Sequence, residues 1–338
     1  MAALPDALAM GLRAWNERQP FFSRSGSMLA IFESILPVFL LVVLGALLKR
    51  WRAIDRDMWG GLEQLGFYVL FPALLFVTLA EAEFSGMAVG GLAIESIGSL
   101  SLIALLLTLC WPLFSAAGVS GPAFTSVFQT STRWNAFIAL AIAEKLYGAQ
   151  SLALVALIAT LIIIPINLYN IGMLVWFGGG TRSLGIFAKK IATNPMIIGS
   201  VAGVAVNLLK IPIYHPLMEA TELVGHTSLS LGLLMVGAGL RLADALKPRP
   251  LALLPVVLKL LFMPLIMTVS AYVLGIRGEQ LLTIAMGASV PTAMNGYVLA
   301  KQMGGDAPLY AAVATLQTVA SFFTIPVVLA ATAYLAGG

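Results

Sequence analysis

The residues best suited to chemistry in this sequence lie inside two long apolar tracts. The first tract contains "QTSTRWNAFIAL", residues 129–140, and places Arg133 about eleven residues from either end of the tract. A guanidinium group is permanently charged and can hold a carboxylate through two parallel hydrogen bonds. Thr132 and Asn135 add polar groups beside it. These residue types predict a binding site for a small organic anion.

Arg133 needs polar surroundings at this depth. Exposing arginine to lipid near the middle of a bilayer costs at least ~2.5–3.5 kcal/mol. The guanidinium is therefore expected to face a bound anion or a fixed acidic partner. A structural ion pair is the alternative, but Glu144 lies eleven residues further on and Glu95 lies near the outer end of another apolar stretch. We favour the anion site.

The second tract reads "LLTIAMGASVPTAMNGYVLAKQMGG", residues 281–305, and contains Pro291 in its middle. Proline has no backbone N–H and clashes with the carbonyl four residues back, so a helix kinks or breaks there. In lipid the freed backbone groups must find partners within the protein. We therefore predict a functional break inside the bundle rather than an ordinary proline kink, with Thr292 and Asn295 beside it.

The composition places the chain among membrane proteins. Of its 338 residues, 60% are hydrophobic and only 10% are charged. Soluble domains have roughly 45–50% apolar and about 25% charged residues. The net charge of +4 is modest and predicts no nucleic-acid partner. Cys110 is the only cysteine, which excludes disulfides and cysteine metal clusters, and we expect no metal or cofactor.

Apolar runs separated by short polar breaks predict ten membrane spans. The predicted ranges are 29–48, 60–79, 89–109, 122–146, 149–177, 194–212, 216–240, 251–275, 280–303 and 307–335.

The loop charges predict that both termini lie outside. With that orientation, eleven basic residues fall in inward loops and three in outward loops, as the positive-inside rule requires. The inward residues are Lys49, Arg50, Arg52, Arg56, Arg182, Lys189, Lys190, Arg241, Lys247, Arg249 and Lys301, and the outward ones are Lys145, Lys210 and Arg277. We expect a multi-pass protein of the cell (inner) membrane.

Proline and glycine spacings indicate an internal repeat. Asn135 lies 98 residues after Pro37, and Pro291 lies 96 residues after Pro195. Gly148 and Gly304 follow Asn135 and Pro291, respectively, by thirteen residues in both cases. These residues occur in the same order and at nearly the same spacings in both parts of the chain, which suggests two halves of five helices. Because five is odd, the second half must be inverted in the membrane, as in many secondary transporters.

The predicted fold is an all-α polytopic membrane protein. It has ten transmembrane helices in two inverted five-helix repeats, with crossed, discontinuous helices four and nine. The predicted parts are an N-terminal extension at 1–28, a first repeat at 29–178, a cytoplasmic loop at 179–193 and a second repeat at 194–338. The expected site combines residues from both breaks: Thr132, Arg133, Asn135, Pro291, Thr292 and Asn295.

Four segments carry a resemblance to a known family. "RWNAFIALAIAEKLYG" and "ASVPTAMNGYVLAKQMGGD" resemble the crossing segments of the auxin efflux carrier family, and "NPMIIGSVAGV" and "ILPVFLLVVLGALLKR" look like its helix-six and helix-one openings. The resemblance runs from about residue 28 to the C-terminus and is more specific in the second half. Asn135 and Pro291 match the crossover residues of the family.

The resemblance implies a fold and a class of substrate. It implies two inverted five-helix repeats, similar to those of sodium–bile acid symporters, and transport of auxin-like or malate- or malonate-like carboxylates. The Gly-x-Pro that follows the first crossover asparagine in the family is absent, because Leu140, Ala141 and Ile142 occupy that stretch. Span four is therefore expected to unwind less than span nine.

Other function classes find less support in the sequence. A cation/proton antiporter or a sodium-coupled symporter of similar fold is the alternative, but an antiporter needs a deep carboxylate. Glu33, Glu63, Glu219 and Glu222 all lie near span ends. An enzyme would need a nucleophile–base pair or metal ligands at depth, and the chain has two histidines and no such pair. A receptor without transport is also consistent with the sequence. The expected partners are the organic anion, the lipid bilayer and, as an option, a second copy of the chain.

The inverted topology predicts opposite locations for two fusion sites. A reporter fused after Gly179 should report the cytoplasmic side, and one fused at Gly338 should report the outer side, because the intervening five spans are odd in number. Paired phosphatase and fluorescent-protein fusions measure both positions. The same side for both sites would contradict the inverted repeat.

Overall fold

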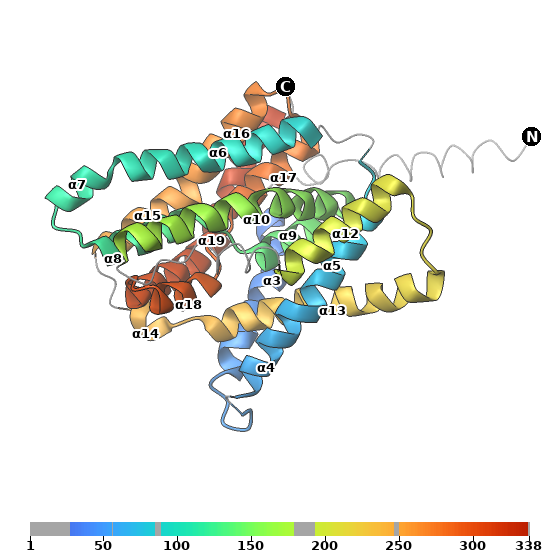
Figure 1. The fold of residues 1–338 in the computed structure, drawn as a ribbon, viewed down its shortest axis with the longest axis horizontal. Coiled ribbons are helices and arrows are strands. Elements are labelled where there is room, and N and C mark those ends of the chain that lie inside the picture. The colour runs from blue at the N-terminus through green and yellow to red at the C-terminus, as the bar shows by residue number, and fades with distance from the viewer. Residues whose placement is uncertain (1–27, 56, 85–88, 179–192, 247–249, 337–338) are drawn as a thin grey trace, which may run out of the picture.

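A computed structural model describes residues 28–55, 57–84, 89–178, 193–246 and 250–336 (Figure 1). Regular structure in these ranges is helical, without β-strands. Most of the predicted extension at 1–28 and of the predicted loop at 179–193 lies outside the described residues.

Helices occupy every range that hydropathy predicts. In the first half they are α3 (Met28–Leu48), α4 (Met58–Leu65), π-helix η1 (Gly66–Leu70), α5 (Phe71–Ala80), α6 (Val89–Leu109), α7 (Trp111–Ala116), α8 (Gly121–Thr132), α9 (Ala136–Tyr147) and α10 (Ala149–Phe177). In the second half they are α12 (Pro195–Leu209), α13 (His215–Gly239), α14 (Leu242–Ala245), 3-10 helix η2 (Pro250–Ala252), α15 (Leu253–Val257), π-helix η3 (Leu258–Phe262), α16 (Met263–Val273), α17 (Gly278–Ser289), α18 (Asn295–Gln302) and α19 (Ala307–Ala336).

Several of these helices are long and apolar enough to cross a bilayer. Six helical stretches of the described chain meet both conditions: Met28–Leu48, Met58–Ala80, Val89–Ala116, Ala149–Phe177, Pro250–Val273 and Ala307–Ala336. Each has at least the roughly 20 residues that a membrane-spanning helix needs. The protein is therefore a multi-pass membrane protein.

Glycines bring α12 and α5 into close contact. The two helices lie side by side in Figure 1. A methyl group added at Gly199 would lie 2.6 Å from the carbonyl oxygen of Pro72, and one added at Gly203 would lie 2.5 Å from that of Phe76. Small residues four apart allow helix backbones to approach in this way. α13 completes this part of the molecule by packing against α3 and α5.

α10 is the centre of the other part of the bundle. It packs against α6, α8, α9 and α17, and α17 packs in turn against α16 and α19. In Figure 1, α6 runs along the upper edge of the molecule, above α8 and α10. The first half of α10, from Ser151 to Ile158, is buried throughout. A helix surrounded on all sides is well placed to hold other elements in register.

Both predicted helix breaks are present. The chain leaves helical geometry at residues 133–135, between α8 and α9, and at residues 290–294, between α17 and α18. The first residue after each break point is extended, with φ −71° and ψ 155° at Arg133 and φ −71° and ψ 153° at Val290. Span four unwinds over fewer residues than span nine, as expected. The backbone N–H of Asn135 donates to the Pro291 carbonyl over 2.8 Å and joins the two breaks directly.

Enlarging Gly203 should destabilise the bundle. Gly203→Leu forces a side chain against the backbone of Phe76, and such overpacking costs ~1–3 kcal/mol. The melting temperature of the purified protein in detergent should therefore fall. Gly172→Leu on α10 is the matched control, because an added Cβ there meets no atom within 4 Å. Equal melting temperatures for the two variants would contradict the close contact.

Candidate binding site at the helix interruptions

Arg133 lies at the C-terminal end of α8 and is buried, with 4% of its surface exposed. Its Nη1 and Nη2 atoms donate to the Oδ1 atom of Asn167 on α10, both over a long 3.4 Å. Its Nε atom has no hydrogen-bond partner. No carboxylate of the described residues forms an ion pair with it, so the alternative of a structural ion pair with Glu144 or Glu95 is wrong there.

Gln129 leaves a second polar group unused near Arg133. Its side chain is fully buried, and neither its Oε1 nor its Nε2 atom has a partner among the described residues. Gln129 lies four residues before Arg133, about one helical turn from the end of α8. A buried amide without partners costs about 1–3 kcal/mol, which favours a ligand or water at this position.

Thr132 and Asn135 are also buried, but their side chains stabilise the protein around the break. Asn135 is the N-cap of α9, and its Oδ1 atom accepts from the backbone N–H of Ile138 over 3.3 Å. Thr132 donates to Oδ1 of Asn170 over 3.1 Å. Asn167 and Asn170 thus form the interhelical bonds that their spacing on α10 favours.

The second break is held by Tyr310 of α19. The Tyr310 hydroxyl contacts Oγ1 of Thr292 over 3.1 Å and donates to the Ala293 carbonyl over 2.6 Å. Gly296 permits this approach, because a Cβ atom at that position would overlap the Tyr310 ring. Pro291 and Thr292 are both buried. Their polar groups therefore face protein rather than lipid.

Gln317, also on α19, joins three segments of the site. Its Oε1 atom accepts from the backbone N–H of Thr292, and its Nε2 atom donates to the carbonyls of Thr130 and Pro255, all over 2.9 Å. Neither Gln317 nor Tyr310 is among the site residues predicted from the sequence. The sequence feature that could have identified Gln317 is its polar amide within the apolar run "ATLQTVASFF".

Asn295 stands apart from the other predicted site residues. It begins α18 and is exposed. Its side chain forms no hydrogen bond with the other predicted site residues, all of which lie in the described part of the chain. The structure therefore brings together Thr132, Arg133, Asn135, Pro291 and Thr292, and leaves Asn295 at the edge.

Lys259 is a buried cation near the second break and is not among the site residues predicted from the sequence. It lies in η3 with no exposed surface, and its Nζ atom donates to the Ala288 carbonyl over 2.9 Å and contacts Sδ of Met263 over 3.1 Å. Ala288 belongs to the last turn of α17, where carbonyls lack helical partners. The ammonium group thus stabilises the negative end of that half-helix.

The charge distribution at the two breaks favours an anion. Four half-helix ends meet there: the C-terminal ends of α8 and α17 and the N-terminal ends of α9 and α18. Arg133 and Lys259 lie at the two negative ends. Neither of these two cations forms a salt bridge with a carboxylate of the described residues. Positive helix ends and a buried guanidinium both attract negative charge.

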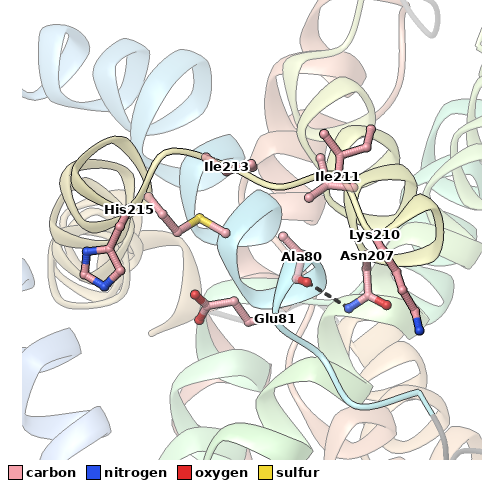
Figure 2. A pocket seen from close by; sticks show the side chains of 9 residues that line it. Ala80, Glu81, Asn207, Lys210, Ile211, Ile213 and His215 are labelled. Atoms are coloured by element: carbon pink, nitrogen blue, oxygen red, sulfur yellow. Dashed lines mark hydrogen bonds between the residues drawn. The ribbon is translucent and has the colours of Figure 1, made fainter.

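A pocket elsewhere on the molecule does not belong to this site. It has a volume of about 390 Å³ and lies where α5 and α12 end and α13 begins. Figure 2 shows Asn207 of α12 directed toward Ala80, to whose carbonyl it donates over 2.8 Å. Glu81 and His215 also line this pocket. None of the predicted site residues lines it.

Comparisons with known proteins agree with a transport function. Residues 181–329 match the family model described as membrane transport protein. An uncharacterized transporter of Methanothermobacter thermautotrophicus is 24% identical over 298 residues, which cover 87% of this chain and 96% of that protein. The family match includes the second break, whereas the first break precedes it.

Removing the Gln317 amide should loosen the second break. Gln317→Met keeps a similar length but leaves the Thr292 N–H without its acceptor, at a cost of ~1–3 kcal/mol. The melting temperature in detergent should fall clearly. Gln150→Met is the control, because Gln150 is exposed and its amide donates a single bond, to the Glu83 carbonyl. A Gln317 variant as stable as the Gln150 variant would show that the break does not depend on this amide.

Proposed function

We propose that the chain is a secondary carrier of small organic anions of the auxin efflux carrier kind, supported by the match of residues 181–329 to the membrane transport protein family and by the similarity to an archaeal transporter. We further propose that the substrate binds at the two helix breaks, between Arg133 and the half-helix ends. The proposed substrates are carboxylates of the auxin-, malate- or malonate-like kind. The protein would act as a carrier and not as an enzyme.

The observation that supports this proposal best is the unpaired state of Arg133. A buried guanidinium normally pairs with an acid, since an isolated buried charge is costly. Here its nearest hydrogen-bond partner is an amide oxygen at 3.4 Å, and its Nε atom is unused. A carboxylate could accept from Arg133 and from Nε2 of Gln129 together. Such a ligand would satisfy both groups that the protein leaves unpaired.

The proposed architecture is ten spans in two inverted repeats of five. Several matched features support it. Each half contains one broken span followed by a long helix with an internal proline, Pro165 in α10 and Pro326 in α19. Gly148 and Gly304, matched by spacing, both have φ +77°. In this arrangement the two broken spans cross at Asn135 and Pro291, and both termini lie outside the inner membrane.

Transport in this scheme requires that the site open to each side in turn. The polar groups of the breaks are covered by protein, so an anion bound there is screened from lipid. The short break segments provide backbone groups and positive helix ends without a fixed counter-charge. A substrate held by Arg133 would supply the missing negative charge and leave when the site opens to the opposite side. A homodimer is compatible with this scheme.

Substitution of Arg133 tests the proposal. Arg133→Ala should weaken malonate binding by roughly 100-fold or more, because a buried charged contact is lost. Arg133→Lys should restore it in part, since an ammonium group keeps the charge without the two-pronged geometry. Isothermal titration with malonate, malate and indole-3-acetate measures binding. Gln129→Leu should weaken binding to a smaller degree.

The stability of the same variants separates the substrate role from a structural one. If an unseen acid paired with Arg133, Arg133→Ala would leave that acid buried alone, at ~3–5 kcal/mol. We expect instead a monodisperse protein with a melting temperature close to that of the exposed control Arg52→Ala. A stable Arg133→Ala protein that binds and transports all three anions normally would contradict the proposed site.

A further inference from the structure

Glu95 of α6 is a buried acid outside the proposed anion site. Only 1% of its surface is exposed. Its Oε2 atom accepts from Ser96 over 3.0 Å, and its Oε1 atom accepts from Ser99 and from Ser270 of α16, both over 3.2 Å. The two serine oxygens Ser99 Oγ and Ser270 Oγ lie 2.7 Å apart. One carboxyl group and three hydroxyls thus form a polar cluster between two apolar helices.

No cation of the described chain balances this carboxyl group. None of the residues that the structure describes forms an ion pair with Glu95. The helices that pack against α6 carry as titratable groups only Tyr169 on α10 and Tyr272 on α16, and α7 and α8 carry none. The first basic residue after α16 is Arg277, whose guanidinium stacks on the Tyr272 ring. An ionised carboxylate buried without a counter-charge is costly, so a bound proton or cation must balance it at least part of the time.

The three hydroxyls suit both charge states of the carboxyl group. A hydroxyl can donate one hydrogen bond and accept two, and its hydrogen rotates freely. When Glu95 is ionised, all three serines can donate to it. When it is protonated, its own O–H can donate to Ser99 or Ser270, while Ser270 turns to donate to the Met267 carbonyl at 3.1 Å. Neither state leaves the carboxyl group without partners.

The geometry favours a proton over a metal cation. Oε1 and the two serine oxygens are separated by 2.7–3.2 Å, which are hydrogen-bond distances. A metal ion among them would have to break these bonds. Ser270 is half-buried and lies three residues from the end of α16, so the cluster is about one helical turn from that end of the helix. Glu95 lies six residues from the start of α6, at the same end of the bundle.

Glu95 belongs to the same packed unit as Arg133. α6 packs against α8, which ends at Arg133, and against α10, which carries Asn167. Tyr169, two residues after Asn167, contacts Ser101 of α6 over 2.7 Å. A shift of α6 against α16 during transport would break the bond between Ser270 and Glu95 and change the affinity of Glu95 for a proton. Proton affinity and conformation are thermodynamically linked. If one conformation binds the proton more tightly, the bound proton in turn favours that conformation.

We propose that Glu95 is the proton-binding site of the carrier, and that a proton taken up there from water accompanies the transported anion and is released to water afterwards. The transport part of this inference rests on the proposed function. Proton binding at Glu95 itself does not.

Infrared difference spectroscopy tests proton binding without any substrate. The full chain in lipid vesicles is compared between roughly pH 6.5 and pH 9, a range that lies above the titration of exposed carboxyl groups and within that of buried ones. A protonated-carboxyl C=O band should appear in the wild type and be absent in Glu95→Gln, which is neutral at every pH. The control Glu279→Gln removes an exposed carboxylate that also binds a serine, Ser151, and should keep the band. A band that persists in Glu95→Gln would overturn the proposal.

Flux measurements in the same vesicles test the coupling. Radiolabelled malonate should accumulate about tenfold for each pH unit of gradient if one proton accompanies one anion. In Glu95→Gln the gradient should have no effect, although malonate exchange continues. Wild-type accumulation driven by a sodium gradient and not by a proton gradient would overturn the proton assignment. Absence of any malonate flux, with the Glu95 band intact, would count against the proposed function and not against proton binding.

Discussion

The structure depends on one constraint: a helix that breaks within a bilayer must pair its freed backbone groups inside the protein. Two breaks lie in this chain, and each supplies part of what the other needs. The Asn135 N–H donates to the Pro291 carbonyl, so the loss of helix in span four is compensated by the loss of helix in span nine. Gln317 completes the pairing from α19. Each break therefore relies in part on the other, and in part on α10 or α19, for its hydrogen-bond partners.

That constraint also explains where the buried charges lie. The three buried ionisable groups discussed above are each held by neutral groups. Arg133 faces the Asn167 amide, Lys259 binds the carbonyl end of α17, and Glu95 is surrounded by serine hydroxyls. Neutral partners hold a charge without cancelling it. Each group is therefore able to respond to a mobile charge, whether an organic anion or a proton, in a way that a closed salt bridge is not.

Close helix packing limits where movement can occur. The α5–α12 contact relies on glycines at which an added Cβ would meet backbone, so these helices are held together tightly. The polar contacts between α6 and α16 and between α8 and α10 involve side-chain amides and hydroxyls, which can exchange partners at little cost. The close glycine contacts described here thus lie between α5 and α12, and the adaptable polar contacts lie beside the first break and between α6 and α16.

The sequence by itself determined the helices and the positions of both breaks. Hydropathy locates the spans because a helix that crosses the bilayer core must be predominantly apolar. Pro291 marks a break because proline lacks a backbone N–H. Arg133 stood out for its depth alone. Only the tertiary structure decided what these residues contact. Lys259 is absent from the predicted site, yet it is fully buried against α17. Glu95 lies near a predicted span end, yet it is enclosed by serines from two helices. Hydropathy reports depth along one helix, whereas burial and hydrogen bonding depend on which helix faces it. The facing residue is 29 positions away for Lys259 and 175 positions away for Glu95.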